Sequence, residues 1–239
     1  MDCPRGANSR HPLLANFATP DRETLLRHAR ALLGATLAEI ADGLGMPVPV
    51  GALRTKGWSG QVIERELGAG DGSAHGPDFA LLGIELKTVP VHGDLIPLES
   101  TAVCHIDPVA IAGESWTTSY ARRKLSEVLF IALDVPAGAR SVDERRVVAV
   151  NLWIPSPHEE SALRADFELF ARDYFRRGRS AEITGHLGRV MQVRPKARNS
   201  SDHRAAYGPD GKPVRIGKCG FYLRPAFVQG ILRGGDTIR

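Results

Sequence analysis

Cysteine is scarce in this 239-residue sequence: Cys3, Cys104 and Cys219 are an odd number, and no two of them have a Cys-x-x-Cys spacing. Neither a disulfide framework nor a thiolate zinc site is therefore indicated. The sequence also lacks an apolar run of the roughly 18 residues that a membrane helix needs, and residues 1–20 lack the continuous apolar segment of a secretory signal. These absences predict a soluble protein of the cytoplasm, a reducing compartment, with no membrane association.

Internal repeats and strong compositional bias are absent as well. With 43% hydrophobic and 24% charged residues the chain is close to globular averages, which argues against a disordered or collagen-like protein. No boundary is clean enough to separate two independent domains. We predict a loose tail over residues 1–18 and a single domain over residues 19–239, divided into an N-terminal lobe of about 19–120 and a basic C-terminal lobe of about 121–239.

Lysine is rare: only six of the 31 cationic residues are lysines, at positions 56, 87, 124, 196, 212 and 218. The charges are also unevenly distributed. Residues 1–120 carry nine Lys and Arg against fourteen Asp and Glu, a net charge of −5, whereas residues 121–239 carry 22 against 13, a net charge of +9. A basic half favours a polyanionic partner, most simply nucleic acid, because neutralised phosphates release counterions. A solvated, arginine-rich surface is the competing interpretation.

Hydrophobic periodicity predicts an α/β chain, with helical spacing near both ends and strand-like segments between them. The predicted helices cover residues 20–33, 36–44, 58–67, 117–127, 156–178 and 225–232. The predicted strands cover residues 78–81, 84–91, 100–106, 128–135, 147–154, 189–194 and 218–223. A loop is predicted over residues 197–217, which are rich in Gly, Pro, Ser and charge.

The densest local signal lies in residues 77–87, which read as a hairpin. Glu85 and Lys87 are two apart in a strand and therefore share a face. Asp78 joins that face only if it pairs directly with Glu85 or Lys87, which centres the turn on Leu81–Leu82 or on Leu82–Gly83. The apolar residues predicted to face the core are Ile84, Leu86 and Val89.

Two carboxylates and an ammonium on one strand pair are suited to a hard divalent cation. Mg²⁺ takes oxygen ligands, here predicted to be Asp78 and Glu85, and keeps sites for water and substrate phosphate. Lys87 would hold or help to deprotonate the attacking water and offset charge at phosphorus. An acidic-x-Lys triplet is common by chance, so a surface hairpin with an ordinary ion pair is the alternative.

Three further features favour the catalytic interpretation. Glu64 follows two apolar residues on a predicted helix just before the hairpin and could complete the site as a third carboxylate. Lys124 lies in a cationic cluster beside the apolar strand 128–135. Lys56 and Gly57 open the Glu64 helix with a cation and a flexible loop, which suits a phosphate at a helix N-terminus.

Six segments, in this order and approximate spacing, resemble the MutH family of endonucleases, which incise one strand in methyl-directed DNA mismatch repair. They are Lys56-Gly-Trp-Ser-Gly-x-x-x-Glu64, Asp78-Phe-Ala-Leu-Leu-Gly-Ile-Glu85-Leu-Lys87-Thr, Leu98-Glu-Ser-Thr101, Ala121-Arg-Arg-Lys124-Leu, Val193-Arg-Pro-Lys-Ala197 and Gly220-Phe-Tyr-Leu223. The resemblance extends from about Pro20 to Leu232. It implies a restriction-endonuclease-like fold, with a mixed central sheet flanked by helices and two lobes around a DNA-binding cleft.

The activity that this resemblance implies is Mg²⁺-dependent nicking of the unmethylated strand at hemimethylated GATC sites in double-stranded DNA, under the control of the MutL mismatch-repair ATPase. The implied catalytic trio is Asp78, Glu85 and Lys87, with Glu64 and Lys124 as accessory residues.

DNA contacts are implied for the loop of Arg194, Pro195 and Lys196 and for Tyr222, which would lie next to the adenine whose methylation matters. An Arg can bond bidentately to a guanine edge, and Pro195 fixes the φ angle of its loop. In Gly220-Phe-Tyr-Leu223, Tyr222 should point away from the core while its two neighbours point into it. One departure is Ala102, where the family pattern places a Phe.

Two other functions remain open at this point. The restriction-endonuclease-like group includes enzymes that cut GATC on both strands, and a DNA-binding module could keep the fold without catalysis. A chain of this size with one Asp-Glu-Lys trio has one active site, so nicking is the natural output of a monomer. We therefore expect a monomeric strand-nicking enzyme.

Overall fold

The computed structural model describes residues 21–49, 57–69, 76–196 and 203–237. Its α-helices are α1 (Arg22–Ala31), α2 (Leu37–Gly43), α4 (Trp58–Glu66), α5 (Tyr120–Leu125), α6 (Pro157–Glu168) and α7 (Pro225–Arg233). Its strands are β1 (Glu85–His92), β2 (Ile96–Pro97), β3 (Thr101–His105), β4 (Val128–Asp134), β5 (Arg146–Trp153), β6 (Met191–Pro195), β7 (His203–Tyr207), β8 (Pro213–Gly217), β9 (Cys219–Leu223) and β10 (Asp236–Thr237). Short 3-10 turns are η1 (Ala110–Ala112), η2 (Trp116–Thr118), η3 (Val142–Glu144) and η5 (Ser180–Glu182), and η4 (Leu169–Phe175) is a π-helix.

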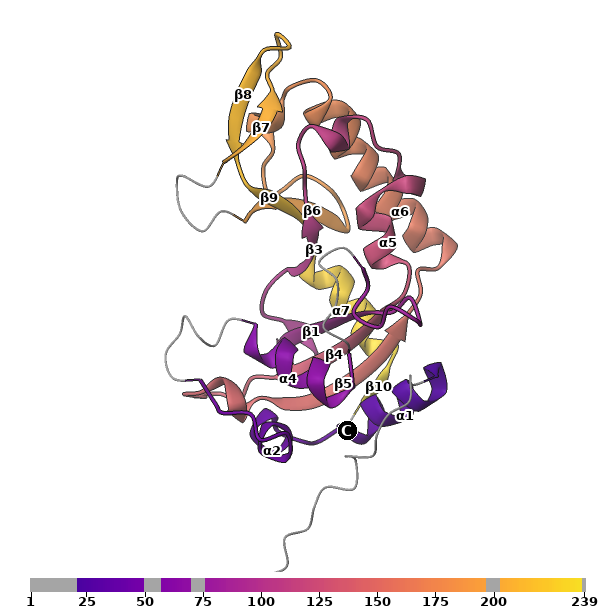
Figure 1. The fold of residues 1–239 in the computed structure, drawn as a ribbon, viewed down its shortest axis with the longest axis vertical. Helices are drawn as coiled ribbons and strands as arrows, with labels where there is room; N and C mark the ends of the chain where they lie inside the picture. Colours follow the sequence, from indigo (N-terminus) through magenta and orange to yellow (C-terminus); the bar gives the residue numbers. More distant parts are fainter. Residues whose placement is uncertain (1–20, 50–56, 70–75, 197–202, 238–239) are drawn as a thin grey trace, which may run out of the picture.

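The largest sheet among the described residues has five strands in the order β10-β5-β4-β1-β2 (Figure 1). β1 and β4 run parallel and the other neighbours are antiparallel, so the sheet is mixed, as predicted. The parallel pairing is made possible by the long connection between the two strands, which contains β3 and α5. It places the start of β1 beside the start of β4.

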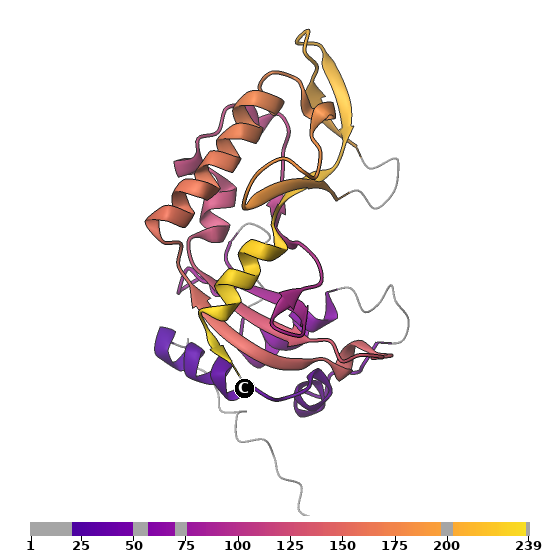
Figure 2. The ribbon, with the colours of Figure 1, turned by 180° about the vertical axis from the view of Figure 1, so that it is seen from behind.

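This sheet separates two hydrophobic cores. α1, α2 and α4 pack on one face, and the other face meets α6, α7 and the three-stranded sheet (Figures 1 and 2). β4 is an uninterrupted apolar strand because it is buried on both faces. Leu129 and Ile131 belong to the first core, and Val128 and Phe130 belong to the second.

β1 follows the same alternation, which corrects one prediction. Ile84 and Leu86 face the core that contains α4, but Val89 belongs to the opposite core. Side chains in a strand alternate with period two, so Val89 shares its face with Glu85 and Lys87 rather than with the two other apolar residues. The face that carries the charges is therefore apolar at its far end.

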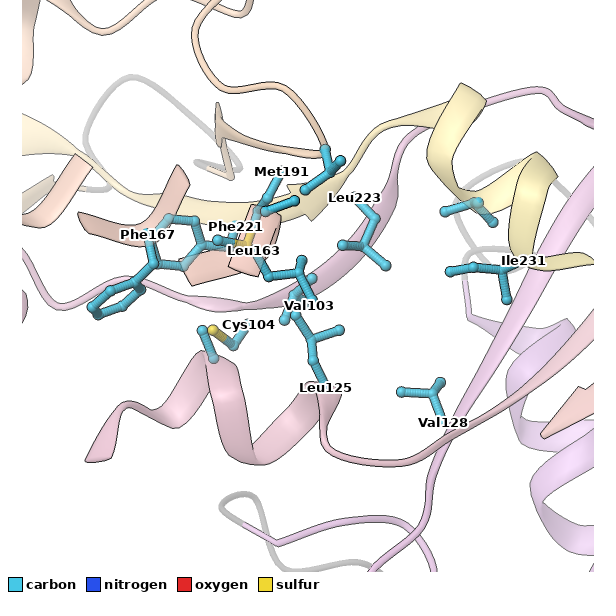
Figure 3. Close-up of a cluster of buried hydrophobic side chains, with 14 of the residues drawn as sticks. Val103, Cys104, Leu125, Val128, Leu163, Phe167, Met191, Phe221, Leu223 and Ile231 are labelled. Atoms are coloured by element: carbon cyan, nitrogen blue, oxygen red, sulfur yellow. The ribbon is translucent and has the colours of Figure 1, made fainter. Parts of the chain in front are cut away.

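The second sheet has the strand order β3-β9-β6 and is antiparallel. Its inner face packs against α6, where Phe167 contacts Phe221 with a centroid separation of 5.7 Å (Figure 3). Met191 and Leu223, which pair across the sheet, join the same cluster. Because β3 follows β2 directly, this sheet is tied to the edge of the larger one.

Two of the correctly predicted helix starts coincide with capping boxes. The capping boxes of Thr36 with Glu39 and of Ser156 with Glu159 are both present. The first helix differs: it begins at Arg22 with Asp21 as its N-cap, whose carboxylate accepts a hydrogen bond from Thr24 N at 2.8 Å. The predicted first residue of this helix, Pro20, lies outside the described residues.

Several segments differ from the predictions. Residues 78–81 form no strand beyond a single bridge at Phe79, the helix predicted over 117–127 covers only Tyr120–Leu125, and the helix from Pro157 changes to a π-helix after Glu168. Residues 203–217, predicted as part of a loop, form the hairpin β7–β8 (Figure 1). This hairpin projects from the main sheets and buries little apolar surface, so its strands lack the alternating pattern that reveals a strand.

The two-residue strands β2 and β10 were not predicted either. Two residues are too few to show an alternating pattern in the sequence. These strands are defined only by their pairing with β1 and β5. None of the described helices combines the length and the apolar character needed to cross a membrane.

Candidate active site

The hairpin before β1 has the register that brings its acids together. Phe79 and Ile84 form an antiparallel bridge, with Phe79 N donating to Ile84 O at 2.9 Å. This pairing centres the turn on Leu81–Leu82, the first of the two predicted alternatives, and places Asp78 beside the start of β1. Asp78 Oδ2 accepts a hydrogen bond from Leu86 N at 2.7 Å. The backbone of β1 thus holds the carboxylate in place.

Glu85 lies at the centre of the site, only 3% exposed. Its Oε1 accepts a hydrogen bond from Lys87 Nζ at 2.5 Å, and its Oε2 accepts one from Lys124 Nζ at 2.7 Å. Burying a carboxylate is costly unless it is paired, and here each oxygen has its own ammonium. The predicted trio and Lys124 therefore meet around one buried acid.

Lys124 reaches Glu85 because of the sheet topology. Glu85 pairs with Val128 at the start of the parallel β1–β4 ladder, and α5 ends just before β4. Lys124 Nζ also donates to Gly76 O at 2.6 Å, which links α5 to the segment that leads into Asp78. Burial alone would lower the pKa of Lys124, but the hydrogen bond and charge of Glu85 outweigh it and raise the pKa. Lys124 is therefore an ammonium at neutral pH and cannot be a metal ligand.

Glu64 supplies a third carboxylate from α4. Burial raises its pKa most strongly, and the negative charges of Asp78 and Glu85 raise it further, against the opposing effect of Lys87. Gly60 lies beside this carboxylate at the start of the same helix: a Cβ added at Gly60 would be 3.6 Å from Glu64 Oε1, an ordinary van der Waals contact. Glu64 therefore lies within electrostatic range of all three trio residues, and its role at the site stays a prediction.

The chemistry of these donors fits a divalent cation. Asp78, Glu85 and Glu64 carry three negative charges against the two positive charges of Lys87 and Lys124, which leaves an excess of one negative charge when all are ionised. Carboxylate oxygens are the ligands that Mg²⁺ prefers in proteins. Among the described residues no three His, Cys, Asp or Glu side chains already stand close enough to hold an ion. Glu85 would have to exchange a lysine hydrogen bond for the metal.

A second group of predicted residues lies on the three-stranded sheet. Phe221 and Leu223 are buried and Tyr222 is partly exposed, as the alternation predicted. Arg194 is exposed on the neighbouring strand, followed by the exposed Pro195. Lys196 Nζ stands 5.9 Å from the centroid of the Tyr222 ring, a distance typical of a cation–π contact.

The surroundings of Tyr222 include the departure at position 102. Ala102 pairs with Tyr222 across β3 and β9, so a larger side chain at 102 would lie against the tyrosine ring. Burial raises the pKa of Tyr222, Arg194 lowers it and Glu99 raises it. The phenol is therefore neutral at physiological pH and can donate a hydrogen bond.

Sequence analysis missed Ser100 and Gln192, which support this surface. Ser100 Oγ accepts hydrogen bonds from Gln192 Nε2 at 2.7 Å and from Arg194 Nη1 at 3.2 Å. Gln192 is buried and pairs with Tyr222 across the sheet. Ser100 belongs to the segment Leu98-Glu-Ser-Thr101, but nothing in that segment indicates its partners, because the contacts join positions more than 90 residues apart.

One of the predicted DNA contacts, Lys56, lies outside the described residues. Lys56 precedes Gly57, the N-cap of α4, which has a φ of +83° and no side-chain cap. Residues 197–202 separate Lys196 from β7. The placement of Lys56 therefore stays a prediction.

Comparison with known proteins gives one consistent result. A family model described as "DNA mismatch repair enzyme MutH" matches residues 67–166, which include the hairpin, β1, α5 and β4. The chain is similar to the DNA mismatch repair protein MutH of Vibrio cholerae serotype O1 (strain M66-2), with 41% identity over 90% of this chain and 97% of that protein. The corresponding proteins of Pasteurella multocida (strain Pm70) and Pectobacterium atrosepticum are 42% and 39% identical, over 90% and 92% of this chain and 96% and 95% of their own lengths.

Proposed function

The chain belongs to the MutH family and is a DNA mismatch repair endonuclease, and from that premise we propose that it uses Mg²⁺ to nick the unmethylated strand at hemimethylated GATC sites. A divalent metal cofactor is implied by the family. The observation that carries the proposal is the convergence of Asp78, Glu85 and Lys87 at the start of β1, with Lys124 and Glu64 around them.

Asp78 and Glu85 would hold the cation, with Glu64 as an additional oxygen donor. When bound, the ion supplies Lewis-acid activation of water and of the scissile phosphate. Asp78 is suited to this role because its carboxylate uses Oδ2 for the hydrogen bond from Leu86 N, which fixes the side chain and leaves the other oxygen to face a ligand.

The two lysines have different roles in this proposal. Lys87 is one-fifth exposed, so its ammonium can orient a water molecule and offset negative charge at phosphorus. Lys124 is less exposed and bonds both Glu85 and Gly76 O, so it positions the acid and the segment before Asp78. Only Lys87 is expected to approach the reacting atoms.

Recognition of the site is assigned to the three-stranded sheet. Arg194 would form paired hydrogen bonds with a guanine edge, and Lys196 would add a phosphate contact. The ring of Tyr222 would approach the adenine and detect an added methyl group. Lys56 would bind a phosphate beside the start of α4.

The five-stranded and three-stranded sheets would form the two sides of a DNA-binding cleft within a single domain over residues 19–239. Each sheet takes strands from both sequence halves, 19–120 and 121–239, since β4 joins β1 and β3 joins β9. With one trio per chain, a monomer would nick one strand. The MutL ATPase would control this nicking, and the cytoplasm, where the chromosome lies, is the expected location.

A nicking assay tests the proposal. Hemimethylated, fully methylated and unmethylated GATC duplexes are incubated with the protein, with and without Mg²⁺ and with and without MutL. We expect Mg²⁺-dependent nicks in unmethylated strands that MutL accelerates. Double-strand cuts that ignore both methylation and MutL would replace the repair assignment with that of a restriction enzyme.

An Asp78→Ala variant isolates the metal site. It should abolish nicking and leave duplex binding largely intact, because Asp78 lies beside the start of β1 in the five-stranded sheet, whereas the proposed base contacts lie on the three-stranded sheet. Unchanged nicking would rule out Asp78 as a metal ligand. Binding by either protein should weaken steeply with added salt, since the contacts are to phosphates.

A further inference from the structure

Arg145 is a cation that neither the trio nor the predicted DNA contacts include. It follows η3 and directly precedes β5, and its half-buried side chain lies against the start of α4. Arg145 Nη1 donates to Ser59 Oγ at 3.3 Å, a long hydrogen bond, and within the described part of the chain no carboxylate comes within ion-pair distance of the guanidinium. Among the described residues, Arg145 thus has a hydroxyl partner but no counter-ion.

The surroundings of Arg145 make its positive charge costly. Burial lowers the pKa of Arg145, and only the more distant Glu99 acts in the opposite direction. The guanidinium also lies at the N-terminal end of α4, where the unpaired backbone N–H groups carry partial positive charge and the N-cap Gly57 offers no side chain. The half-buried Lys87 and Lys124, by contrast, both bond Glu85.

Arg145 shares an acidic neighbour with one of the predicted recognition residues. Glu99 acts electrostatically on both Arg145 and Tyr222, so it stands within range of each. α4, which Arg145 contacts through Ser59, also carries Glu64 of the metal site. Both ribbon views show the β4–β5 connection extending beside α4, at the end of the five-stranded sheet (Figures 1 and 2). Arg145 thus contacts the start of the helix that carries Glu64, on the side of the five-stranded sheet where β4 turns into β5.

We propose that Arg145 binds a backbone phosphate of the duplex and that Ser59 holds the guanidinium in position for it. The inference rests on the proposed function, because the anion it requires is the DNA of that reaction. An arginine fork matches two phosphate oxygens, and the phosphate would neutralise the charge that no described side chain balances. The contact is to the backbone, so it contributes affinity without base specificity.

The first test measures binding of Arg145→Gln to a hemimethylated GATC duplex without Mg²⁺, by fluorescence anisotropy at several salt concentrations. We expect roughly 5- to 10-fold weaker binding at low salt and a slope of log affinity against log salt that is smaller by about 0.9, the value for one lost phosphate contact. A duplex without GATC should lose affinity by the same factor. A slope equal to that of the unmodified protein would overturn the proposal.

Arg140 offers a matched control. It is an exposed arginine in the same β4–β5 connection, so Arg140→Gln removes the same charge without removing the half-buried guanidinium. Its effect on the slope should be less than half that of Arg145→Gln. Equal effects of the two substitutions would mean that only overall charge matters, which contradicts a specific contact.

A second test does not depend on how well Arg145→Gln folds. Arg145→Lys keeps the charge but loses the fork, and both it and the unmodified protein are measured on duplexes that carry one neutral methylphosphonate at a time. At one position, the methylphosphonate should weaken DNA binding by the unmodified protein. The same methylphosphonate should weaken binding by Arg145→Lys at least threefold less. If no position shows this difference, the proposal is wrong. Arg145 would instead belong to a site for free phosphate if inorganic phosphate competes with DNA for the protein while a methylphosphonate at every duplex position has the same effect on both proteins. This outcome would overturn the proposal.

Failure of this inference and failure of the proposed function give different results. If the unmodified protein neither binds nor nicks hemimethylated GATC, the proposed function fails. If it nicks as expected and the Arg145 variants bind with an unchanged salt slope, only the phosphate contact is refuted.

Discussion

At the start of β1 the charged side chains are buried or partly buried and paired, whereas Arg194 on β6 is exposed and loosely held. Glu85 is 3% exposed and bonds two ammonium groups at 2.5 and 2.7 Å, while Arg194 is exposed and has one described hydrogen bond of 3.2 Å. The first arrangement fixes the positions of charges that must act on one phosphate. The second leaves long side chains free to adapt to a nucleic acid surface.

This difference predicts how each region responds to substitution. Removing one partner of a buried ion pair leaves an uncompensated charge and costs roughly 3–5 kcal/mol, whereas exposed pairs contribute about 0–1 kcal/mol. Substitutions at the trio should therefore affect both folding and chemistry. Substitutions of exposed side chains on the three-stranded sheet should affect DNA binding and leave the free energy of unfolding almost unchanged.

The largest effect is expected for Glu85→Gln. It leaves the ammonium groups of Lys87 and Lys124 without their carboxylate, so the free energy of unfolding should fall by roughly 3–5 kcal/mol in urea titrations, and nicking should disappear. The double variant Glu85→Gln with Lys124→Met should regain part of this stability but no activity. If the Glu85→Gln variant is as stable as the unmodified protein, the ion pairs of Glu85 with Lys87 and Lys124 do not stabilise the fold.

Arg194→Gln should produce the opposite profile. Loss of a bidentate guanine contact costs roughly 1–3 kcal/mol, or about 10- to 100-fold in affinity for GATC, and should reduce the preference for GATC over other sequences. The free energy of unfolding should change by less than about 0.5 kcal/mol because Arg194 is exposed. Arg164→Gln on α6 is the control, since it removes an arginine paired with Glu168 outside the proposed cleft. Equal loss of affinity for all sequences would assign Arg194 to phosphate binding.

Tyr222→Ala should affect methylation discrimination more than binding. One methyl group in a contact is worth roughly 1–3 kcal/mol, so the ratio of nicking rates on unmethylated and methylated strands should fall by about 10-fold. Tyr222→Phe keeps the ring and should keep the ratio. A Phe variant that loses discrimination as completely as the Ala variant would show that the hydroxyl group, rather than the ring, reads the methyl group.

The smallest effect is expected for Glu64→Gln on stability. Burial and two neighbouring acids raise the pKa of Glu64 above its ordinary value of 4.5, so its ionised form destabilises the metal-free fold at neutral pH. The variant should have a Tm higher by roughly 1–3 °C at pH 7. This gain should vanish as the pH falls through the raised pKa, because Glu64 is then protonated in the folded protein.

The same Glu64→Gln variant should nick more slowly, since it loses an oxygen donor with negative charge. In the unmodified protein, the Mg²⁺ concentration for half-maximal nicking should rise as pH falls, because protons compete with the cation for Glu64. A Tm gain that is constant from pH 4.5 to 8 would show that Glu64 is not the titrating group.

Local signals in the sequence predicted most of the secondary structure. The capping boxes at Thr36 and Ser156 fixed two helix starts, and the alternation in Gly220-Phe-Tyr-Leu223 gave the correct face for Tyr222. The hairpin β7–β8 was not predicted, because a hairpin that projects from the main sheets does not need alternating buried apolar residues. The sequence did not indicate that Val89 and Leu86 face opposite cores, because a strand between two cores is apolar on both faces.

What the sequence determined by itself was the local chemistry: two acids and a lysine at strand spacing, a turn that could bring Asp78 beside Glu85, and a basic C-terminal half. Only the tertiary structure decided that Lys124 bonds Glu85, that Ser100 ties Gln192 to Arg194, and that no carboxylate of the described segments pairs with Arg145. Such contacts join residues that lie tens of residues apart along the chain. They depend on the parallel pairing of β1 with β4 and on the packing of one sheet against another, which no local pattern of residues encodes.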